Sequence, residues 1–309
     1  MIITILSCFA FAFLILFVGK NIKGSLFKWI FILPASLFIY FLTFITNITS
    51  VSIWQKQPWI PQMGVSLDFK LDGLSLLFSL LITGIGALVF LYSSFYLKGH
   101  RYIHKFYAYL TLFMGSMLGI VLSDNLLVLF MFWELTSISS FFLIGFKNKD
   151  KSSRKGALLA YGITSLGGFF LLAGAVLLYM ISGTYSIHEL ITYSTEIQQH
   201  SLYVLATIFI FIGAFTKSAQ FPFYSWLPQA MKAPTPVSAY LHSATMVKAG
   251  IYLLARVLPI LGATLFWNYT LIIVGGFTML YAALHSIIRT DLKEILAYST
   301  VSALGMMVF

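Results

Sequence analysis

Long apolar runs recur along the whole sequence and limit what this chain can fold into. They occupy residues 2–18, 29–46, 73–97, 106–122, 125–146, 157–181, 203–220, 236–256, 266–288 and 294 onward. A membrane-crossing helix needs about 20 apolar residues, a barrel strand only about 9 to 11, and the runs show almost no period-2 alternation. The sequence therefore predicts an all-α polytopic membrane protein with about ten transmembrane helices.

Composition excludes several other classes of protein. Of the 309 residues, 60% are hydrophobic and 9% are charged, whereas about a quarter are charged in an average soluble domain. The net charge of +10 would suggest nucleic-acid binding in a soluble protein, but membrane topology explains it better, so we expect no nucleic-acid partner. The single cysteine, Cys8, excludes a disulfide framework or a cysteine-rich metal site. No cofactor motif is present, so we expect no bound metal or cofactor.

The basic residues are distributed unevenly between the two sets of loops. Loops after odd-numbered runs carry 14 Lys and Arg residues, and the opposite loops carry three. The positive-inside rule makes the first set cytoplasmic, so the N-terminus is predicted to lie outside. Residues 47–72 are expected to form an external loop, either with Trp54 and Trp59 at the level of the lipid headgroups or as a simple connector.

Glu134 is the first of three charged residues that lie inside apolar runs. A charge at a helix centre costs about 2.5 to 3.5 kcal/mol on insertion scales, so such residues are functional candidates that usually face a partner or water. An unbroken apolar stretch precedes Glu134 and an uncharged one follows it. We expect Glu134 to handle a proton or an ion; a helix-packing carboxylate bonded to a nearby Ser, Thr or Lys is the alternative.

Lys217 is the second such residue, and prolines follow it. Pro222 and Pro228 lie just beyond it, and proline breaks a helix and leaves free carbonyls that need protein or water partners at membrane depth. The pattern predicts a broken helix with a charge at the break, which in many transporters marks a binding site. The alternative is an interfacial lysine where the helix simply ends.

Lys248 is the third, and we expect it near the middle of a helix spanning 236–256. His242 lies six residues earlier, about 120° around a helix, so Thr245, three residues from each, could bridge them. A buried ammonium without a carboxylate or water is easily deprotonated, so Lys248 could load and release a proton. For Lys248 and His242 alike, a packing role is the alternative.

Asp72 and Asp124 are secondary candidates. Each lies at an expected helix boundary, where a carboxylate is favoured by capping and by the helix dipole. Capping is the favoured interpretation for both.

Several ordered strings resemble one known family of membrane proteins. They are LDGLS at 71–75, FWELT at 132–136, GAFTKSAQFP at 213–222, APTPVSAYLHSATMVK at 233–248 and DLKEILAYST at 291–300. Together they resemble the antiporter-like family shared by Mrp cation/proton antiporters and the proton-pumping subunits of respiratory complex I. Within it, the chain is most similar to the N-terminal part of the MrpA-type (MnhA-type) subunits of Mrp antiporters.

The resemblance implies a fold and a set of roles. Residues 1–105 would hold the first three helices, 106–256 a first five-helix unit, and 257–309 the start of a second, inverted unit that looks truncated. Lys217 would give and take a proton under the influence of Glu134, with Lys248 and His242 as the next relay. The same residues were selected above from burial cost and proline placement.

The resemblance also implies a function and partners. We expect a bacterial inner-membrane subunit, not an enzyme, that exchanges cytoplasmic Na⁺ for external H⁺ together with other Mrp antiporter subunits. The alternative is a proton-pumping membrane subunit of a complex I-type oxidoreductase or a membrane hydrogenase. A third interpretation is an inactive fragment whose buried charges only hold helices together.

Overall fold

The computed structural model describes residues 1–21, 24–46, 52–60 and 65–309, and most of them are helical. The longer helices are α1 (Ile2–Val18), α2 (Ile32–Leu42), α3 (Gly73–Tyr96), α4 (Ile103–Leu122), α5 (Leu126–Ile144), α6 (Lys151–Ser182), α9 (Tyr203–Lys217), α12 (Lys248–Leu261), α13 (Leu265–Ile287) and α14 (Leu292–Val308). The shorter elements are η1 (Gly19–Asn21), η2 (Gly24–Phe31), α7 (Ile187–Thr192), α8 (Ser194–Gln199), η4 (Phe223–Ser225), α10 (Trp226–Ala230), α11 (Thr235–Val237) and the π-helical turn η5 (Ser238–Ala244).

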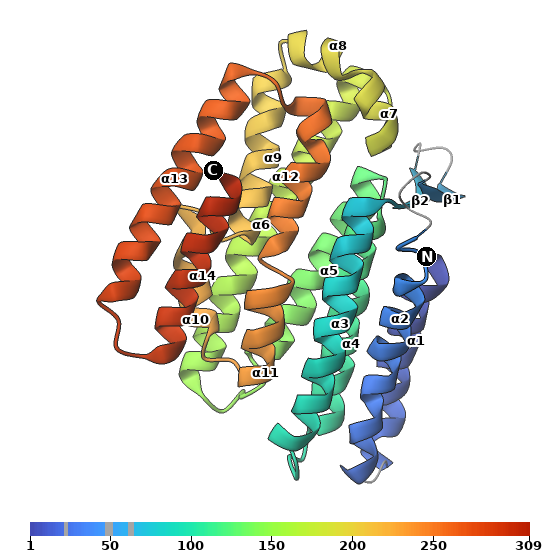
Figure 1. Cartoon of the computed structure of the whole chain (residues 1–309), viewed down its shortest axis with the longest axis vertical. Helices are drawn as coiled ribbons and strands as arrows, with labels where there is room; N and C mark the ends of the chain where they lie inside the picture. Colours follow the sequence, from blue (N-terminus) through green and yellow to red (C-terminus); the bar gives the residue numbers. More distant parts are fainter. Residues whose placement is uncertain (22–23, 47–51, 61–64) are drawn as a thin grey trace.

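The long helices form an up-and-down bundle (Figure 1). Helices α1 and α2 lie at one side, α13 and α14 at the other, and the remaining long helices fill the space between them (Figure 1). Contacts link α1 to α4, α4 to α5, α5 to α6, α6 to α9 and α13 to α14. Helix α4 is enclosed on almost all sides, whereas α13 exposes most of its surface. The core therefore runs through α4, α5, α6 and α9.

The helices agree with the expectation of a multi-pass membrane protein. Among the described residues, five helices are long and apolar enough to cross a membrane: α3, α4, α5, α6 and α13. Residues 2–18, 27–42 and 203–217 form shorter apolar helices. These apolar helices enclose the charged residues that are buried in the bundle.

Strands occupy part of the segment expected to be a loop. In it, β1 (Ile53–Ile60) pairs with β2 (Val65–Leu71) as an antiparallel hairpin. Trp54 packs against the Lys70 ammonium, 4.9 Å from the ring centre, and edge-on against the His188 ring, whereas Trp59 is exposed. Residues 47–51 and 61–64 of the expected loop lie outside the described residues.

The expected continuous helix over 236–256 is wrong. The chain instead forms α11, the turn η5 and, after a break at Thr245–Val247, helix α12. No proline lies in this break; the Val247 carbonyl accepts a hydrogen bond from Ser218, and the Met246 and Lys248 N–H groups bond to nearby carbonyls. The break predicted near Lys217 is present: α9 ends there, and short helical pieces follow.

The basic connections gather at one end of the bundle. Figure 1 shows the turns after α1, α3, α5 and α13 at the lower end, and α7, α8 and the hairpin at the upper end. The two sets of loops that the sequence distinguishes by charge therefore lie at opposite ends.

Candidate functional site

Lys217 is fully buried at the C-terminal end of α9. Its Nζ donates hydrogen bonds to the Trp133 carbonyl oxygen at 3.0 Å and to Ser137 Oγ at 2.8 Å. The same atom lies 5.1 Å from the centre of the Trp133 ring, in a cation–π contact. Helix α5 thus supplies most of the polar environment of this ammonium.

Glu134 follows the residue whose carbonyl binds Lys217, so the sequence-predicted pair lies together. Its Oε1 is buried without a hydrogen-bond partner in the described part of the chain. The two charges attract each other, but no carboxylate oxygen of a described residue lies within 4.0 Å of the Lys217 ammonium. The pair is therefore electrostatically linked without being locked in a direct ion pair.

Two glycines of α6 make room for this arrangement. A Cβ at Gly168 would collide with Glu134 Oε1, and a Cβ at Gly167 would collide with Thr216 Oγ1. Ser165 lies one turn away on α6, and its buried hydroxyl interacts with the Glu134 carboxylate. The backbone of α6 therefore approaches the charged pair closely because these positions lack side chains.

Hydrogen bonds to three other segments hold the break after α9. Ser218 Oγ donates to the Val247 carbonyl at 2.7 Å, and Trp226 Nε1 donates to the Thr216 carbonyl at 2.9 Å. The Phe221 N–H donates to Thr278 Oγ1 on α13 at 3.0 Å. The Ser218 bond joins the break after α9 directly to the break before α12, so the two interruptions face each other.

His242 lies in the π-helical turn η5 and is fully buried. Neither ring nitrogen has a hydrogen-bond partner among the described residues. The ring stands edge-on to Trp226 with 5.8 Å between ring centres, and Trp226 in turn binds Thr216 next to Lys217. The Trp226 side chain therefore contacts both His242 and the end of α9.

The positions of Lys248 and Thr245 differ from the expectation. Lys248 begins α12 rather than lying in the middle of a helix, is partly exposed, and has no side-chain bond to a described residue. Thr245 Oγ1 donates to the Tyr240 carbonyl at 2.7 Å, so the predicted bridge between His242 and Lys248 is wrong. The helical-wheel argument fails because the chain is not helical between them.

Asp72 caps α3, as predicted. Its carboxylate accepts from the Ser75 N–H at 3.0 Å, and Ser75 Oγ accepts from the Asp72 N–H, completing a capping box. The guanidinium of Arg256 binds both carboxylate oxygens, with Nη2 2.8 Å from Oδ1. Burial acts to raise the pKa of Asp72, but the hydrogen bonds and charge of Arg256 outweigh it and hold that pKa below its usual range.

Asp124 does not cap the helix that follows it but contacts the start of another one. Asn125 caps α5, whereas Asp124 Oδ2 accepts from Ser186 Oγ at 3.1 Å and from the His188 N–H at 3.4 Å, at the start of α7. Burial raises the pKa of Asp124, although these hydrogen bonds oppose the rise. Both aspartates thus organise the end of the bundle away from the basic loops.

Sequence reasoning missed Ser137 and Gln220. Ser137 lies three residues after Glu134, on the same face of α5, and that spacing could have revealed it. Gln220 is fully buried in the break, with Nε2 donating to the Ser218 carbonyl at 3.1 Å and Oε1 unpaired among the described residues. Within the described ranges, no group of three or more His, Cys, Asp or Glu side chains could hold a metal ion.

The fold and this site define a class: a polytopic helical membrane protein with a buried lysine at a broken helix and a glutamate on the neighbouring helix. A family model described as "NADH:quinone oxidoreductase/Mrp antiporter, TM" matches residues 123–309, and one described as "NADH-Ubiquinone oxidoreductase (complex I), chain 5 N-terminus" matches residues 59–107. The chain belongs to the first of these families, the NADH:quinone oxidoreductase/Mrp antiporter transmembrane family.

Similar curated proteins are named as antiporter subunits. The chain is 54% identical over 275 residues to the Na(+)/H(+) antiporter A1 subunit of Staphylococcus haemolyticus, covering 89% of this chain and 34% of that protein. It is 51% identical over 299 residues to the Staphylococcus aureus protein of the same name, covering 96% and 37%. The chain thus spans about a third of the length of these relatives.

Solved structures share the fold. A chain of the Mrp complex from Dietzia sp. DQ12-45-1b matches with a TM-score of 0.90 and 38% identity, over 99% of this chain and 33% of that one. A chain of the membrane-bound sulfane sulfur reductase, an archaeal respiratory membrane complex, matches with a TM-score of 0.84 and 22% identity, over 98% and 63%. Because its sequence identity is only 22%, the second match shows similarity of the fold alone.

Proposed function

We propose that this chain is part of the MrpA-type subunit of a multi-subunit cation/proton antiporter that exchanges cytoplasmic Na⁺ for external H⁺, driven by the proton gradient. The observation that carries the proposal is the Glu134–Lys217 pair: a fully buried lysine and a partly buried glutamate of opposite charge, without a direct ion pair. A buried charge is costly, and a pure packing role would favour closing the pair. The names of the relatives supply the exchanged ions.

The proposed proton route starts at this pair and continues through the two facing breaks. Lys217 takes up and releases the proton, and the nearby Glu134 charge stabilises its protonated form. Gln220 and His242 then offer buried polar atoms without partners among the described residues, and Lys248 follows at the start of α12. Buried polar atoms of this kind are normally paired with ordered water, which could connect the groups into a relay.

Sodium is expected to follow another route. An ammonium is a poor ligand for a hard cation, which binds oxygen donors, so Lys217 and Lys248 serve the proton path. Asp72 is already engaged by Arg256, and Asp124 by Ser186 and the His188 N–H. We therefore assign neither aspartate to the proton route, and both retain positioning roles.

The finer architecture belongs to the same proposal. We propose about ten membrane-crossing segments, counting the shorter apolar helices, with a first five-helix unit at 106–256, the start of a second, inverted unit at 257–309, and residues 1–105 preceding both. The basic end of the bundle would face the cytoplasm and the N-terminus would lie outside. Other antiporter subunits would surround the chain in a bacterial cell membrane.

Proton movement in inverted membrane vesicles tests the function. The full-length gene and its neighbours would be expressed in a strain without its own antiporters, and Na⁺ would be added without an electron donor. We expect Na⁺-dependent proton movement that Glu134→Gln and Lys217→Met abolish while the assembled complex stays in the membrane. Glu189→Gln, which changes an exposed acid on α7, is the matched control and should leave exchange unchanged.

Three other outcomes would contradict the proposal. Proton movement that requires an electron donor would indicate the redox-driven pump of the complex I class. Absence of both variants from the membrane would give Glu134 and Lys217 a structural role. Exchange that survives in both variants would remove the pair from the proton path.

A further inference from the structure

A cavity of about 610 Å³ opens at the basic end of the bundle, away from the charged pair. Four segments meet around it: η1, η2, the end of α3 with the turn after it, and the start of α4. Its lining is formed by Gly19, Lys20, Phe27, Lys28, Ser94, Phe95, Lys98, Gly99, His100, Arg101, Ile103 and His104. Among the described residues, neither Asp nor Glu contributes to it.

The cations of this cavity are not neutralised by the described part of the protein. Lys20, Lys28, Lys98 and Arg101 are all exposed, and no carboxylate of a described residue lies within 4.0 Å of any of them. Four like charges around one hollow repel each other. An anion in the hollow would relieve that repulsion.

His104 supplies a buried polar group at the same place. Its side chain is 94% buried, lines the cavity, and its Nε2 has no hydrogen-bond partner among the described residues. The η1 backbone packs closely against it, because a Cβ at Gly19 would collide with the His104 Cβ. A buried ring nitrogen of this kind is normally paired with a protein group, ordered water or a bound ligand.

The rim of the cavity is apolar on the outer side of α3. Phe95 lines the cavity and is 69% exposed on the surface of that helix, whereas Phe27 is buried beneath it. A ligand held here can therefore place an anionic group among the lysines and leave an apolar tail along Phe95. Free phosphate lacks such a tail.

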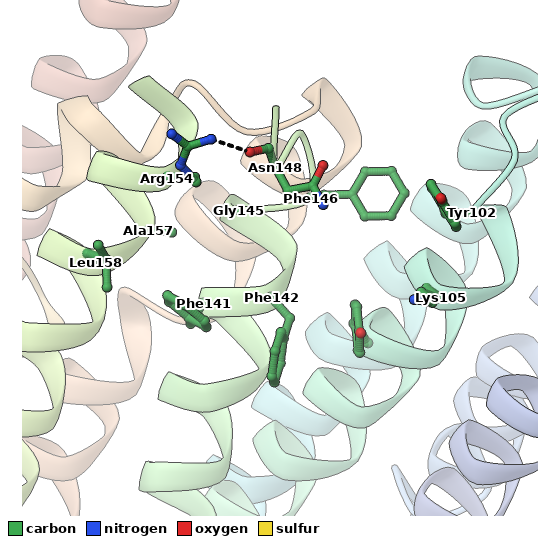
Figure 2. A pocket seen from close by; sticks show the side chains of 11 residues that line it. Tyr102, Lys105, Phe141, Phe142, Gly145, Phe146, Asn148, Arg154, Ala157 and Leu158 are labelled. Carbon is green, nitrogen blue, oxygen red and sulfur yellow. Dashed lines mark hydrogen bonds between the residues drawn. The ribbon is translucent and has the colours of Figure 1, made fainter. Parts of the chain in front are cut away.

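A neighbouring cavity of about 420 Å³ at the same end does not share this chemistry. Figure 2 shows its lining, in which Phe141, Phe142 and Phe146 dominate and Arg154 already donates to the Asn148 carbonyl at 2.7 Å. It contains Lys105 but, among the described residues, no comparable cluster of unpaired cations. The cluster of cations therefore distinguishes the 610 Å³ cavity from another cavity between helix ends.

We propose that the cavity lined by Lys20, Lys28, Lys98, Arg101 and His104 binds the phosphate headgroup of an anionic phospholipid. Lysine and arginine recognise a phosphate through charge-assisted hydrogen bonds, and basic pockets at helix ends are known to bind anionic lipid headgroups. The lipid would hold α1 and η2 against α3 and α4. This role is independent of the antiport proposed above.

The test counts bound lipid on the intact protein. The full-length protein, purified in its complex in detergent, would be titrated with dihexanoyl-phosphatidylglycerol and, separately, with dihexanoyl-phosphatidylcholine, and bound lipid would be counted by native mass spectrometry. We expect one phosphatidylglycerol per copy of the chain that Lys20→Gln/Lys98→Gln/Arg101→Gln weakens at least tenfold, and little binding of phosphatidylcholine. His104→Leu, which keeps all four cations, should weaken binding several-fold.

Lys149→Gln/Lys151→Gln/Lys155→Gln is the matched control, because it removes equal charge from exposed lysines at the same end that line neither cavity. It should change phosphatidylglycerol binding less than twofold. Equal losses in both triple variants would overturn the proposal in favour of non-specific attraction. Competition by millimolar inorganic phosphate as effective as by the lipid would identify a free-anion site instead.

Discussion

The glycine at position 168 controls how the glutamate of the site is held. In the structure the α6 backbone at Gly168 abuts Glu134 Oε1, so any side chain there must displace the carboxylate. A displacement of this size changes the electrostatic link to Lys217 without removing either charge. A substitution at Gly168 therefore tests the position of the Glu134 carboxylate while both charged groups stay in place.

Gly168→Ala is expected to lose most Na⁺-dependent proton exchange, at least tenfold, while the protein still inserts and assembles. Gly162→Ala in the same helix is the control, because a Cβ there meets nothing within 4 Å. It should be neutral or stabilise the protein by up to about 1 kcal/mol, since alanine favours helix over glycine. Normal exchange in Gly168→Ala would show that the position of the carboxylate is unimportant.

Asp72 combines a helix cap with an ion pair, and two substitutions separate them. Asp72→Asn retains a side-chain oxygen for capping and loses the charge bound by Arg256. We expect it to cost about 1 to 2 kcal/mol, the worth of a hydrogen bond to a charged group reduced by partial exposure. Asp72→Ala should cost about 1 kcal/mol more, because the cap is also lost. Thermal unfolding in detergent measures both.

The stabilisation by the Asp72 charge has a defined pH dependence. The pKa of Asp72 is lower in the folded protein than its ordinary value, which is near 3.9 in an unfolded chain. The charge therefore contributes its full stabilisation above about pH 4 and loses it as pH falls through the folded-state pKa. We expect the difference in unfolding midpoint between wild type and Asp72→Asn to shrink below about pH 4. A constant difference down to pH 2 would contradict the role of the charge.

At the scale of elements, long helices were predictable and interruptions were only partly so. The break after α9 was foreseen because Pro222 and Pro228 mark it in the sequence. The break at Thr245–Val247 was not, because the Val247 carbonyl is satisfied by Ser218, which lies 29 residues away in the chain. The hairpin was missed for a related reason: it depends on strand pairing and on contacts with α7, rather than on a local signal.

The same distinction applies to the site. Glu134 and Lys217 were identifiable because burying a charge in an apolar run is costly. The roles of Ser137 and Gln220 depend on which helices meet, and uncharged polar residues stand out less from their surroundings. Lys248 was identified as a charge but placed in the wrong local structure, since the turn η5 departs from helical periodicity.

The bond between Ser218 and Val247 is expected to hold the two breaks together. Ser218→Ala removes the donor and leaves a buried carbonyl with one partner fewer, which should destabilise the protein by about 1 to 2 kcal/mol. Exchange should also fall several-fold, because the proposed proton route crosses between the breaks. Ser299→Ala, which removes an exposed local bond to the Leu296 carbonyl on α14, should change neither quantity. Equal effects of the two substitutions would show that the bond between the breaks contributes no more to stability and exchange than a local bond on the surface.

At the scale of the whole molecule, the charged ends of the bundle predict its orientation in the membrane, which can be measured directly. The basic connection after α5 and the connection formed by α7 and α8 lie at opposite ends (Figure 1). Cys8 is the only cysteine in the sequence and is buried, so Cys8→Ala provides a background in which single cysteines report their side of the membrane.

In that background, we expect a membrane-impermeant maleimide to label Glu196→Cys in intact cells and Lys149→Cys only in inverted vesicles, since both positions are exposed and the end rich in lysine should face the cytoplasm. Labelling after membrane disruption is the control that both thiols react when accessible. The reverse pattern would place the N-terminus inside and reverse the direction in which the proposed proton route opens. Labelling of both positions from one side would contradict the bundle, because an odd number of crossings must separate the two ends.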